Sequence, residues 1–244
     1  MTTKAAVLCG GEGKRLKPLT DYFQKTMIPI GPRRRPLLEY VVRLLVWHKV
    51  KEMGLLTGYR SDQIENYFGD GSRFEAKIVY SHDTQATSGS ANAVSNAMDS
   101  GKLGDFDNLV VYYGDILSDL NITDLLKLHH SKDAGVTLVL SRNYSLPVGV
   151  AKVENGFVKS FKEKPSMELS VTTGCMVIAR RALRMLRKLK GRADLMTHFV
   201  PETVDANERV AAYYVDGFWY DVGTTEAYER LDDRLIDTHL RFLG

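Results

Sequence analysis

Short apolar runs alternate along the chain with stretches whose apolar residues recur at helical spacing. The apolar runs have the length of buried strands, and they are 4–9, 53–57, 76–80, 108–113, 136–140 and 175–179. Helical spacing occupies 36–49, 61–68, 90–100, 121–132 and the final stretch 224–240. Strands that alternate with helices are typical of a largely parallel sheet. The pattern therefore predicts an α/β fold, with a Rossmann-like, mixed but mostly parallel sheet flanked by helices.

One segment in the second half departs from this alternation. The pair Asn155-Gly156 separates two short runs of strand character, 149–153 and 157–161. Asn-Gly between two such runs indicates a two-residue hairpin turn. We therefore expect a small antiparallel excursion within the fold. The chain shows no internal repeat and no low-complexity linker, so residues 1–244 are predicted to form a single domain.

Composition excludes several classes of protein. The 244 residues are 44% hydrophobic and 26% charged, which is typical of a soluble globular protein. Lys plus Arg number 33 and Asp plus Glu 30, and this net charge of +3 gives no general affinity for nucleic acid. The two cysteines form no CxxC pair, and the six histidines have no zinc-site spacing. Without a signal-peptide pattern or an apolar run of about 20 residues, the sequence predicts a cytoplasmic protein that binds neither membrane nor nucleic acid.

Two basic segments remain open to more than one interpretation. The run 180–192 places Ala182, Leu183, Leu186 and Leu189 on one helical face, which predicts a docked helix with solvated charges. An acidic partner is the alternative. Arg33–Arg35, between two prolines, predicts an exposed turn that either lies near a phosphate site or is simply solvated.

A glycine-rich loop follows the first predicted strand. Gly10, Gly11 and Gly13 allow a tight turn whose backbone N–H groups converge on an anion, and Lys14 and Arg15 add positive charge. The loop is not a Walker motif, which needs a glycine at the position of Leu8 and a Ser or Thr at that of Arg15. A dinucleotide-binding loop needs a small residue where Leu16 stands. Phosphate binding is favoured, with a purely structural turn as the alternative.

Several segments in chain order resemble one known family. They are 8–20 (LCGGEGKRLKPLT), 24–30 with 36–40, 88–91, Gly114-Asp115, 163–165 (EKP) and 219–224 (WYDVGT). Together they resemble the sugar-1-phosphate nucleotidyltransferases, also called nucleotide-sugar pyrophosphorylases. The resemblance spans 8–228 and implies that a sugar 1-phosphate attacks the α-phosphorus of a nucleoside triphosphate (NTP) and releases pyrophosphate. It also implies the two substrates as partners, with a homo-oligomer as a further possibility.

The resemblance implies specific roles for residues on the nucleotide side. Residues that would bind the nucleotide are Leu8, Gly10, Gly11, Gly13, Lys14, Gln85 and Gly89. Arg15 would neutralise the leaving pyrophosphate, and Lys25 would reach the α-phosphate region. Gln85 is the candidate for reading the base, and Asp83 is its rival, because the spacing before Gly89 is one residue longer than the family's.

The sugar side and the metal are assigned in the same way. Lys164 would hold the sugar phosphate as a further catalytic charge, and Gly149, Glu163 and Thr173 would contact the sugar phosphate. Asp115 and Asp221 would hold Mg²⁺, which prefers carboxylate oxygens, substrate phosphates and water. The ordinary alternatives are capping roles for the two aspartates and a surface ion pair for Glu163-Lys164.

Some positions depart from the family's pattern. Lys14 replaces a usual Thr, Thr26 replaces a Pro after Lys25, and Thr173 replaces an Asn before Gly174. The length leaves no room for the left-handed β-helical domain of some relatives. The leading substrates are mannose 1-phosphate with GTP, slightly favoured, or glucose 1-phosphate with UTP or dTTP.

Two other classes of function stay open. The first is a catalytically silent nucleotide-sugar-binding subunit that partners an active relative. The charged residues that the reaction needs argue against it, and they are Arg15, Lys25, Asp115, Lys164 and Asp221. The second is a dinucleotide-dependent oxidoreductase, which Leu16 disfavours.

Overall fold

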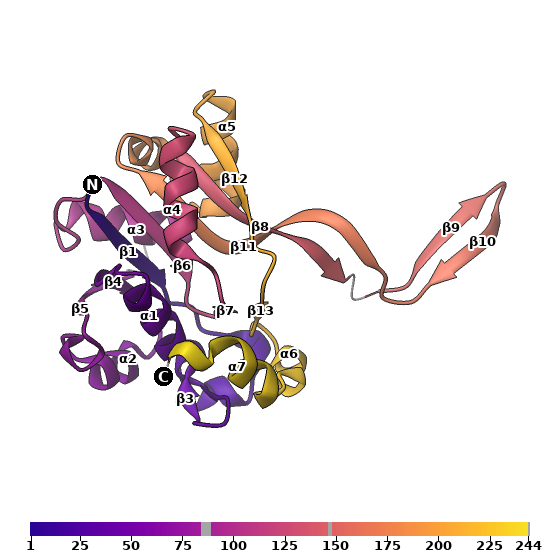
Figure 1. Ribbon diagram of the computed structural model, residues 1–244, viewed down its shortest axis with the longest axis horizontal. Coiled ribbons are helices and arrows are strands. Elements are labelled where there is room, and N and C mark those ends of the chain that lie inside the picture. Colours follow the sequence, from indigo (N-terminus) through magenta and orange to yellow (C-terminus); the bar gives the residue numbers. More distant parts are fainter. Residues whose placement is uncertain (84–88, 146–147, 244) are drawn as a thin grey trace.

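A seven-stranded sheet forms the centre of the molecule in a computed structural model that describes residues 1–83, 89–145 and 148–243 (Figure 1). Its strand order is β12–β8–β11–β6–β1–β4–β5. The strands are β1 (Thr3–Leu8), β4 (Glu52–Thr57), β5 (Lys77–His82), β6 (Asn108–Tyr113), β8 (Val136–Ser145), β11 (Ser166–Ala179) and β12 (Val210–Tyr214). β1 pairs in parallel with β4 and β6, and β4 with β5, whereas β11 runs antiparallel to both β6 and β8. The predicted mixed, mostly parallel α/β sheet is confirmed.

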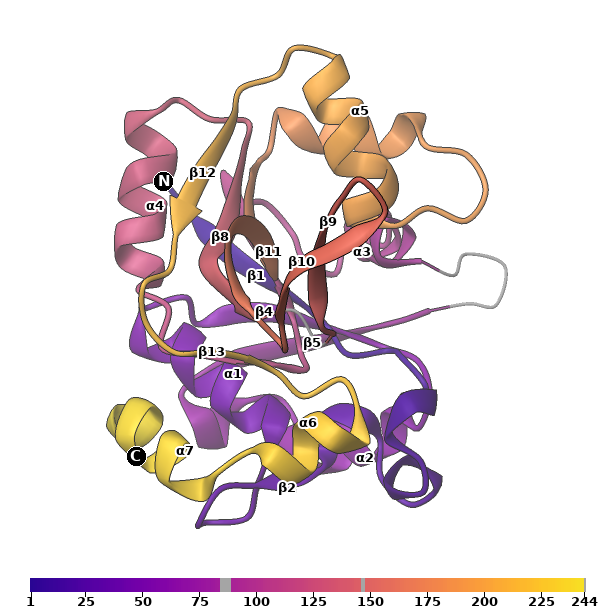
Figure 2. The same ribbon diagram turned by 90° about the vertical axis from the view of Figure 1, so that its right-hand side faces the viewer.

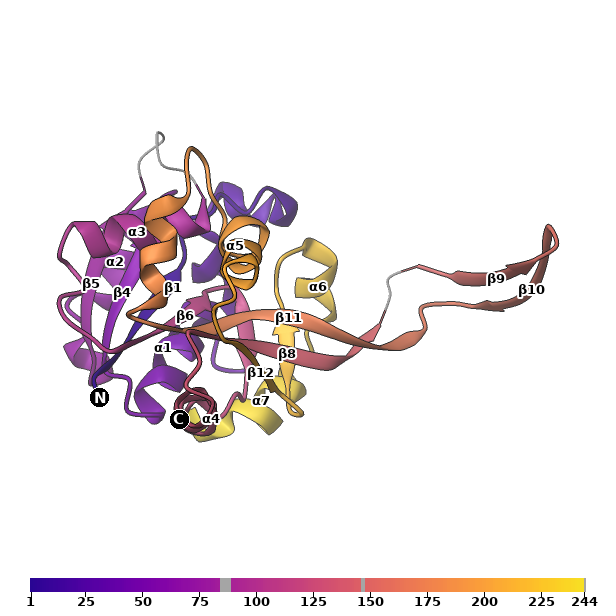
Figure 3. The same cartoon turned by 90° about the horizontal axis from the view of Figure 1, so that it is seen from above.

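Helices cover both faces of this sheet, because successive strand residues point to opposite sides. In β1, Ala5 and Val7 face one core, and Ala6 faces the other. The first core is closed by α1 (Leu37–Trp47), α2 (Ser61–Phe68), α4 (Ile122–Ser131) and α7 (Asp233–Leu240). The second is closed by α3 (Ser90–Asp99), α5 (Val200–Asp205) and the 3-10 helix η6 (Ala182–Lys188). Figure 3 shows α4 and α7 on the opposite side of the sheet from α3 and α5.

Two small antiparallel pairs lie beside the main sheet. β2 (Pro29–Ile30) pairs with β3 (Arg35–Pro36), and β7 (Ile116–Ser118) pairs with β13 (Trp219–Asp221). The register of the second pair sets Asp221 opposite Ile116, and the amide of Val222 donates to the carbonyl of Asp115 at 3.1 Å. This pairing brings two segments that are far apart in the sequence to one point on the sheet edge.

The C-terminal prediction needs a correction. The expected single helix over 224–240 is two helices, α6 (Thr225–Arg230) and α7, which lie one after the other along the base of the molecule (Figure 2). Leu231 is extended, and the Asp232 side chain accepts a hydrogen bond from the Arg234 amide at 2.8 Å. The second helix therefore has its own N-cap, because a capping aspartate competes with the continuation of a helix.

The basic run 180–192 forms a shorter element than predicted. Its helical part is η6, which buries Ala182, Leu183 and Leu186 against the second core, while Leu189 lies beyond the helix end. The predicted apolar face is therefore confirmed, but the helix is shorter than the basic run. Among the described residues, no helix has both the length and the apolar character that a bilayer span requires.

A hairpin projects from the sheet at the far end of β8 and β11 (Figures 1 and 3). It consists of β9 (Val150–Glu154) and β10 (Phe157–Lys162), joined by Asn155 (φ 50°) and Gly156 (φ 80°). Two successive residues at positive φ fit the short hairpin turn that the sequence predicts. Every residue of β9 and β10 is exposed. We call residues 148–164 the arm.

Candidate active site at the carboxyl edge of the sheet

A cleft of about 1030 Å³ opens where the parallel strands β1, β5 and β6 end. The carboxyl ends of parallel strands are where ligands bind in open α/β sheets. Many of the predicted site residues line it together: Leu8, Gly10, Gly11, Gly13, Lys14, Arg15, Lys25, Gly89, Asp115, Thr173 and Asp221. Residues that lie far apart in the sequence thus share one concave surface.

The glycine loop is shaped by close contacts at two of its three glycines. A Cβ on Gly10 would lie 2.7 Å from Oδ2 of Asp83, and Gly13 has φ +66°, with Thr20 and Lys25 packed against it. Gly11 has open space on its side-chain face. Within the described ranges, the amides of Gly11, Glu12 and Gly13 donate no hydrogen bond to the protein. Free amides in such a loop are suited to bind an anion.

Gln24 fixes the loop to the segment that carries Lys25. Its side chain is fully buried, donates from Nε2 to the Cys9 carbonyl at 2.5 Å and accepts from the amide and hydroxyl of Thr26 at 2.6 and 2.7 Å. Each of these backbone groups would otherwise be a buried group without a partner, which is costly. The sequence prediction included Gln24 only as part of a motif, since a buried clamp has no signal in residue spacing.

Lys25, Asp115 and Asp221 form the charged centre of the cleft. Lys25 Nζ makes an ion pair with Oδ2 of Asp115, and both side chains are mostly buried. Burial raises the pKa of Asp221, the negative charge of Asp115 raises it further, and Lys25 and Arg15 lower it. These influences place all four residues in one electrostatic neighbourhood.

Arg15 reaches this centre from the glycine loop. The position that a Cβ of Gly223 would occupy is 2.7 Å from Oδ1 of Asp221 and 3.3 Å from Nη2 of Arg15. Because Gly223 has no side chain, the Asp221 carboxylate and the Arg15 guanidinium can both lie close to its backbone. Lys14 makes an ion pair with Glu12 at 3.0 Å, and its side chain is exposed.

Asp83 occupies the end of the cleft beside Gly10. Burial raises its pKa to about 6, partly offset by His82, and its amide donates to the Thr57 carbonyl at 2.8 Å. A half-buried carboxylate at a cleft wall is a candidate for ligand recognition. Its predicted rival, Gln85, lies outside the described residues.

A turn opposite the glycine loop forms another wall. Gly89 has φ +126°, and a Cβ there would collide with the Ala193 carbonyl oxygen. The Ser90 amide donates to Asp194 Oδ1 at 3.0 Å, and the Leu195 amide donates to Ser90 Oγ at 2.8 Å. This bracing brings Arg192, the last residue of the basic run, into the cleft lining. The sequence analysis treated that run as a solvated face and missed this residue.

Thr173 lies in the cleft wall but uses its hydroxyl internally. It is buried, and Oγ1 donates to the Val139 carbonyl at 3.0 Å, while its own carbonyl accepts from Trp219 Nε1 at 3.0 Å. The hydroxyl therefore donates its proton to a backbone carbonyl of β8. The predicted role of Thr173 as a sugar contact stays a prediction.

The remaining predicted sugar contacts lie on the arm, which projects away from the sheet (Figure 1). Gly149 and Glu163 are neighbours there, because a Cβ on Gly149 would be 2.8 Å from Oε2 of Glu163. Lys164 follows, with φ 45°. None of these three lines the cleft as it is formed by the described residues. Of the predicted sugar contacts, Thr173 thus lies in the cleft with the predicted nucleotide and metal residues, and Gly149, Glu163 and Lys164 lie on the arm.

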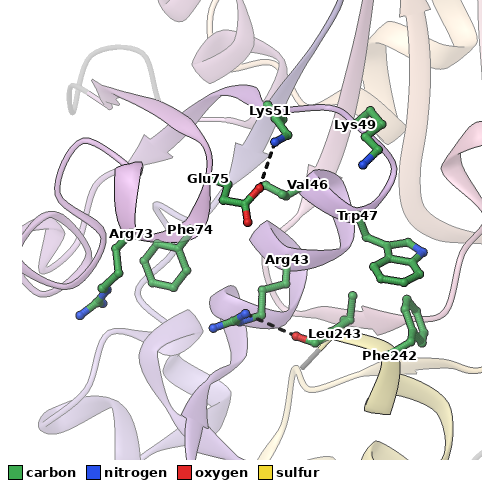
Figure 4. A pocket seen from close by; sticks show the side chains of 10 residues that line it. All are labelled: Arg43, Val46, Trp47, Lys49, Lys51, Arg73, Phe74, Glu75, Phe242 and Leu243. Carbon is green, nitrogen blue, oxygen red and sulfur yellow. Dashed lines mark hydrogen bonds and ion pairs between the residues drawn. The ribbon is translucent and has the colours of Figure 1, made fainter.

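A second, smaller pocket of about 350 Å³ lies near the end of α1 (Figure 4). Trp47 and Phe242 meet edge to face on one side of it, and Lys51 pairs with Glu75 at 3.1 Å on the other. It contains none of the predicted site residues.

The turn Arg33–Arg35 is also outside the cleft lining. Arg33 and Arg34 are exposed, as predicted for the turn. Arg35 pairs with Glu39 at 3.3 Å and Arg34 with Asp233 at 3.7 Å. These pairs favour the solvated interpretation over the phosphate one.

Comparison with known proteins supplies a family for this arrangement. The family described as "Nucleotidyl transferase" matches residues 4–237. The chain is 30% identical over 243 residues to the UTP–glucose-1-phosphate uridylyltransferase of Synechocystis sp., covering 92% of this chain and 61% of that protein. It is 25% identical over 233 residues to the D-glycero-α-D-manno-heptose 1-phosphate guanylyltransferase of Aneurinibacillus thermoaerophilus, covering 95% and 98%.

A solved structure has the same fold. It belongs to a Bacillus anthracis protein assigned as a glucose-1-phosphate thymidylyltransferase, with a TM-score of 0.77, 24% identity and 96% of each chain covered. The chain spans about three fifths of the length of the first curated relatives it matches.

Proposed function

The chain belongs to the nucleotidyl transferase family, and from that premise we propose that it transfers a nucleotidyl group from an NTP to a hexose 1-phosphate. The products are an NDP-sugar and pyrophosphate. One observation carries the proposal: the glycine loop, Lys25 and the carboxylates Asp115 and Asp221 meet in a single cleft at the carboxyl edge of the sheet.

The cleft suits a triphosphate chain. The free amides of Gly11, Glu12 and Gly13 would donate to phosphate oxygens, and the Arg15 guanidinium would neutralise charge on the departing pyrophosphate. Lys25 would balance charge at the α-phosphate, where the sugar phosphate oxygen attacks. In such transfers the protein contributes mainly positioning and charge, with little covalent work of its own.

Asp115 and Asp221 fit a Mg²⁺ ion by the chemistry of their donor atoms. Both are carboxylates on the cleft wall, and burial, together with the negative charge of Asp115, raises the pKa of Asp221. No group of three or more potential metal ligands exists among the described residues, and Mg²⁺ commonly uses one or two carboxylates plus phosphates and water. When bound, the ion would polarise the α-phosphate and shield its charge. Lys25 Nζ, paired with Asp115, would supply part of that positive charge in the free protein.

The sugar phosphate would be held by Lys164, with Glu163 and the backbone of Gly149 beside the sugar ring. A carboxylate accepts hydrogen bonds from sugar hydroxyls, and an ammonium group balances the phosphate. The closeness of Gly149 to Glu163 supports a shared role for them.

For the base, we propose guanine, recognised by Asp83. An ionised carboxylate accepts two hydrogen bonds at once, and guanine presents N1–H and N2–H side by side. Uracil and thymine flank their single N–H with carbonyl oxygens, which repel a carboxylate. The desolvation that raises the pKa of Asp83 means that its ionised form gains from such donors. The similarity to a heptose 1-phosphate guanylyltransferase supports this choice.

The test is pyrophosphate release from a grid of substrates. Five NTPs (ATP, GTP, CTP, UTP and dTTP) are crossed with glucose, mannose, galactose, N-acetylglucosamine and heptose 1-phosphates, each with and without Mg²⁺. We expect one strong, metal-dependent combination that contains GTP. A strong combination with another NTP would contradict the assignment of Asp83 and leave the reaction class standing. A blank grid from folded protein that still binds an NTP would contradict the reaction and favour a silent subunit.

A further inference from the structure

Positive and negative side chains balance among the described residues that line the cleft. The cations are Lys14, Arg15, Lys25 and Arg192, and the carboxylates are Glu12, Asp83, Asp115 and Asp221. The proposed function uses Asp115 and Asp221 for the metal and Asp83 for the base, and it gives the side chain of Glu12 no role. A carboxylate beside amides that are suited to bind an anion repels that anion. The position of Glu12 therefore needs an explanation.

The side chain of Glu12 pairs with Lys14 of the same loop. Oε2 of Glu12 lies 3.0 Å from Nζ of Lys14, and the two side chains are 57% and 78% exposed. Within the described part of the chain, neither side chain has another ion pair or hydrogen bond. Exposed ion pairs of this kind are weak. A more highly charged anion can therefore replace Glu12 as the partner of Lys14.

The backbone beneath this pair is fixed, whereas the two side chains are not. The Gly13 carbonyl accepts hydrogen bonds from the Leu16 amide at 2.8 Å and from Thr20 Oγ1 at 3.0 Å, and Leu16 is fully buried. Exposed side chains change rotamer quickly, without any movement of the backbone. Lys14, which follows Gly13 directly, can therefore exchange one partner for another by rotation of its side chain alone.

The anion that this arrangement favours is pyrophosphate. The free amides of the loop and the Arg15 guanidinium are the groups proposed to hold the end of the triphosphate that leaves. Lys14 lies between Gly13 and Arg15 in the chain and lines the same cleft. When the bond to the α-phosphorus breaks, the departing pyrophosphate gains a negatively charged oxygen. An ammonium group nearby therefore interacts more strongly with the product than with the same two phosphates in the NTP.

We propose that Lys14 binds the leaving pyrophosphate, that Glu12 competes with pyrophosphate for Lys14, and that this pair sets how tightly the product is held. The proposal rests on the proposed function, because the loop must face the end of the triphosphate that leaves. While pyrophosphate is bound, Lys14 contacts the product, and after release it pairs with Glu12 again. Because the free loop keeps Lys14 occupied, the apparent affinity for pyrophosphate is lower than Lys14 alone would give.

Two neutral variants with opposite expected effects test the proposal. Pyrophosphate is titrated calorimetrically into the full chain in a buffer that contains Mg²⁺. Lys14→Met removes the charge and keeps a long side chain, and we expect the Kd for pyrophosphate to rise about tenfold. Glu12→Gln removes the competitor, and we expect the Kd to fall about threefold, in keeping with an exposed ion pair. An unchanged Kd in Lys14→Met, or an unchanged or higher Kd in Glu12→Gln, would overturn the proposal.

The double variant separates competition for Lys14 from simple repulsion by Glu12. If Glu12 acts by occupying Lys14, adding Glu12→Gln to Lys14→Met should lower the Kd by less than Glu12→Gln does in the wild type. An equal effect in both backgrounds would mean that Glu12 acts only through its own charge, and the exchange of partners would be wrong. Lys14→Met should also weaken NTP binding less than pyrophosphate binding, and equal losses would contradict the preference for the product.

A matched ion pair that follows the loop supplies the control. Lys17 and Asp21 also pair at 3.0 Å and are exposed, but neither lines the cleft formed by the described residues. The hydrogen bond and the charge of Asp21 are the main causes that raise the pKa of Lys17. Lys17→Met and Asp21→Asn change the net charge by the same amounts as the two test variants, and both should leave the Kd for pyrophosphate unchanged. Equal shifts in both pairs of variants would mean that net charge sets the affinity, and the proposal would fail.

A failure of this proposal can be told apart from a failure of the proposed function. A blank substrate grid contradicts the reaction itself. If the wild type is active in that grid but binds no added pyrophosphate, or if the variants all bind it alike, only the exchange between Glu12 and Lys14 is wrong. If the exchange takes place, pyrophosphate should inhibit the formation of the NDP-sugar by Glu12→Gln at lower concentrations than it inhibits the wild type.

Discussion

The cleft and the arm are held in shape by opposite means. In the cleft, loops from several strands meet and are braced by hydrogen bonds, such as the buried ones of Gln24 and the partly buried ones of Ser90 with the Asp194 segment. The arm has only its own ladder and exposes every side chain of its strands. A braced site can hold charges in place before a ligand arrives, whereas the strands of the arm are held by the hydrogen bonds of their own ladder. Predictions that affect one region and spare the other therefore test this division.

The largest effect is expected from Asp115→Asn in the cleft. Losing one charge of the pair that would hold the metal should lower kcat at least about 100-fold, since a single preorganised contact is worth this much. Steady-state pyrophosphate release measures it, with a thermal melt to show that the fold is intact. Asp105→Asn is the matched control, because Asp105 pairs with Arg180 on the surface and is 95% exposed. Near-full activity of a folded Asp115→Asn protein would remove the metal assignment.

Lys164→Ala on the arm should also lower turnover about 100-fold, while NTP affinity stays unchanged. The reason is that the proposed triphosphate contacts lie in the cleft, whereas Lys164, the proposed contact of the sugar phosphate, lies on the arm. Calorimetric titration of NTP, alongside kcat, separates the two. Lys152→Ala, on the same arm but paired with Glu154 at 2.7 Å, is the control and should behave as wild type. A parallel loss of NTP binding would contradict this separation of the two contacts.

Gln24→Leu should destabilise the fold by about 1–3 kcal/mol, because the Cys9 carbonyl and the Thr26 amide would lose their partner while buried. Urea denaturation measures the change. Ser160→Ala on the exposed arm should alter the free energy of unfolding by less than about 0.5 kcal/mol. Equal effects from the two substitutions would mean that the cleft is no better braced than the arm.

The smallest effect concerns Asp83 and pH. Its pKa is raised to about 6, so lowering the pH through 6 protonates the carboxyl and removes an acceptor for guanine. The KM for GTP should therefore rise several-fold between pH 7 and pH 5. In Asp83→Asn, the part of the pH dependence of KM that comes from Asp83 should be absent. Only the part that comes from titration of the triphosphate should remain.

The stability of the fold gives a second check on Asp83, with the sign worked out. A raised carboxyl pKa favours the folded state below the unfolded value near 4, and that contribution is lost as pH rises through 6. The free energy of unfolding of Asp83→Asn minus that of the wild type should therefore be larger at pH 7.5 than at pH 4. An unchanged difference across this range would contradict the burial of the charge.

Local signals in the sequence predicted much of the fold. Residues 61–68 form a helix with the predicted bounds, and Asn155-Gly156 makes the predicted turn. The break at Asp232 was missed because the apolar spacing continues across it, and the cap depends on one side chain. The edge strand β12 was missed because its residues are only partly buried and its pattern is weak.

The site was predicted in its parts and not in its assembly. The glycine loop and Asp115 follow β1 and β6, so their convergence follows from the parallel sheet. Asp221 reaches them through the antiparallel pairing of β13 with β7, which local sequence signals do not predict. The separation of Glu163 and Lys164 could not be predicted, because it depends on how far β8 and β11 continue to pair beyond the core. Gln24 and Arg192 act through long-range contacts that leave no spacing signal.

The antiparallel direction of β11 has a consequence for evolution and engineering. Because β11 runs antiparallel beside β8, the chain leaves the sheet and re-enters it at the same end of two neighbouring strands. The arm can therefore be lengthened, shortened or replaced while the strand order of the sheet stays the same. If the arm carries the proposed sugar contacts, grafting the corresponding segment of a relative should change the sugar that is accepted and leave the nucleotide side of the site unchanged.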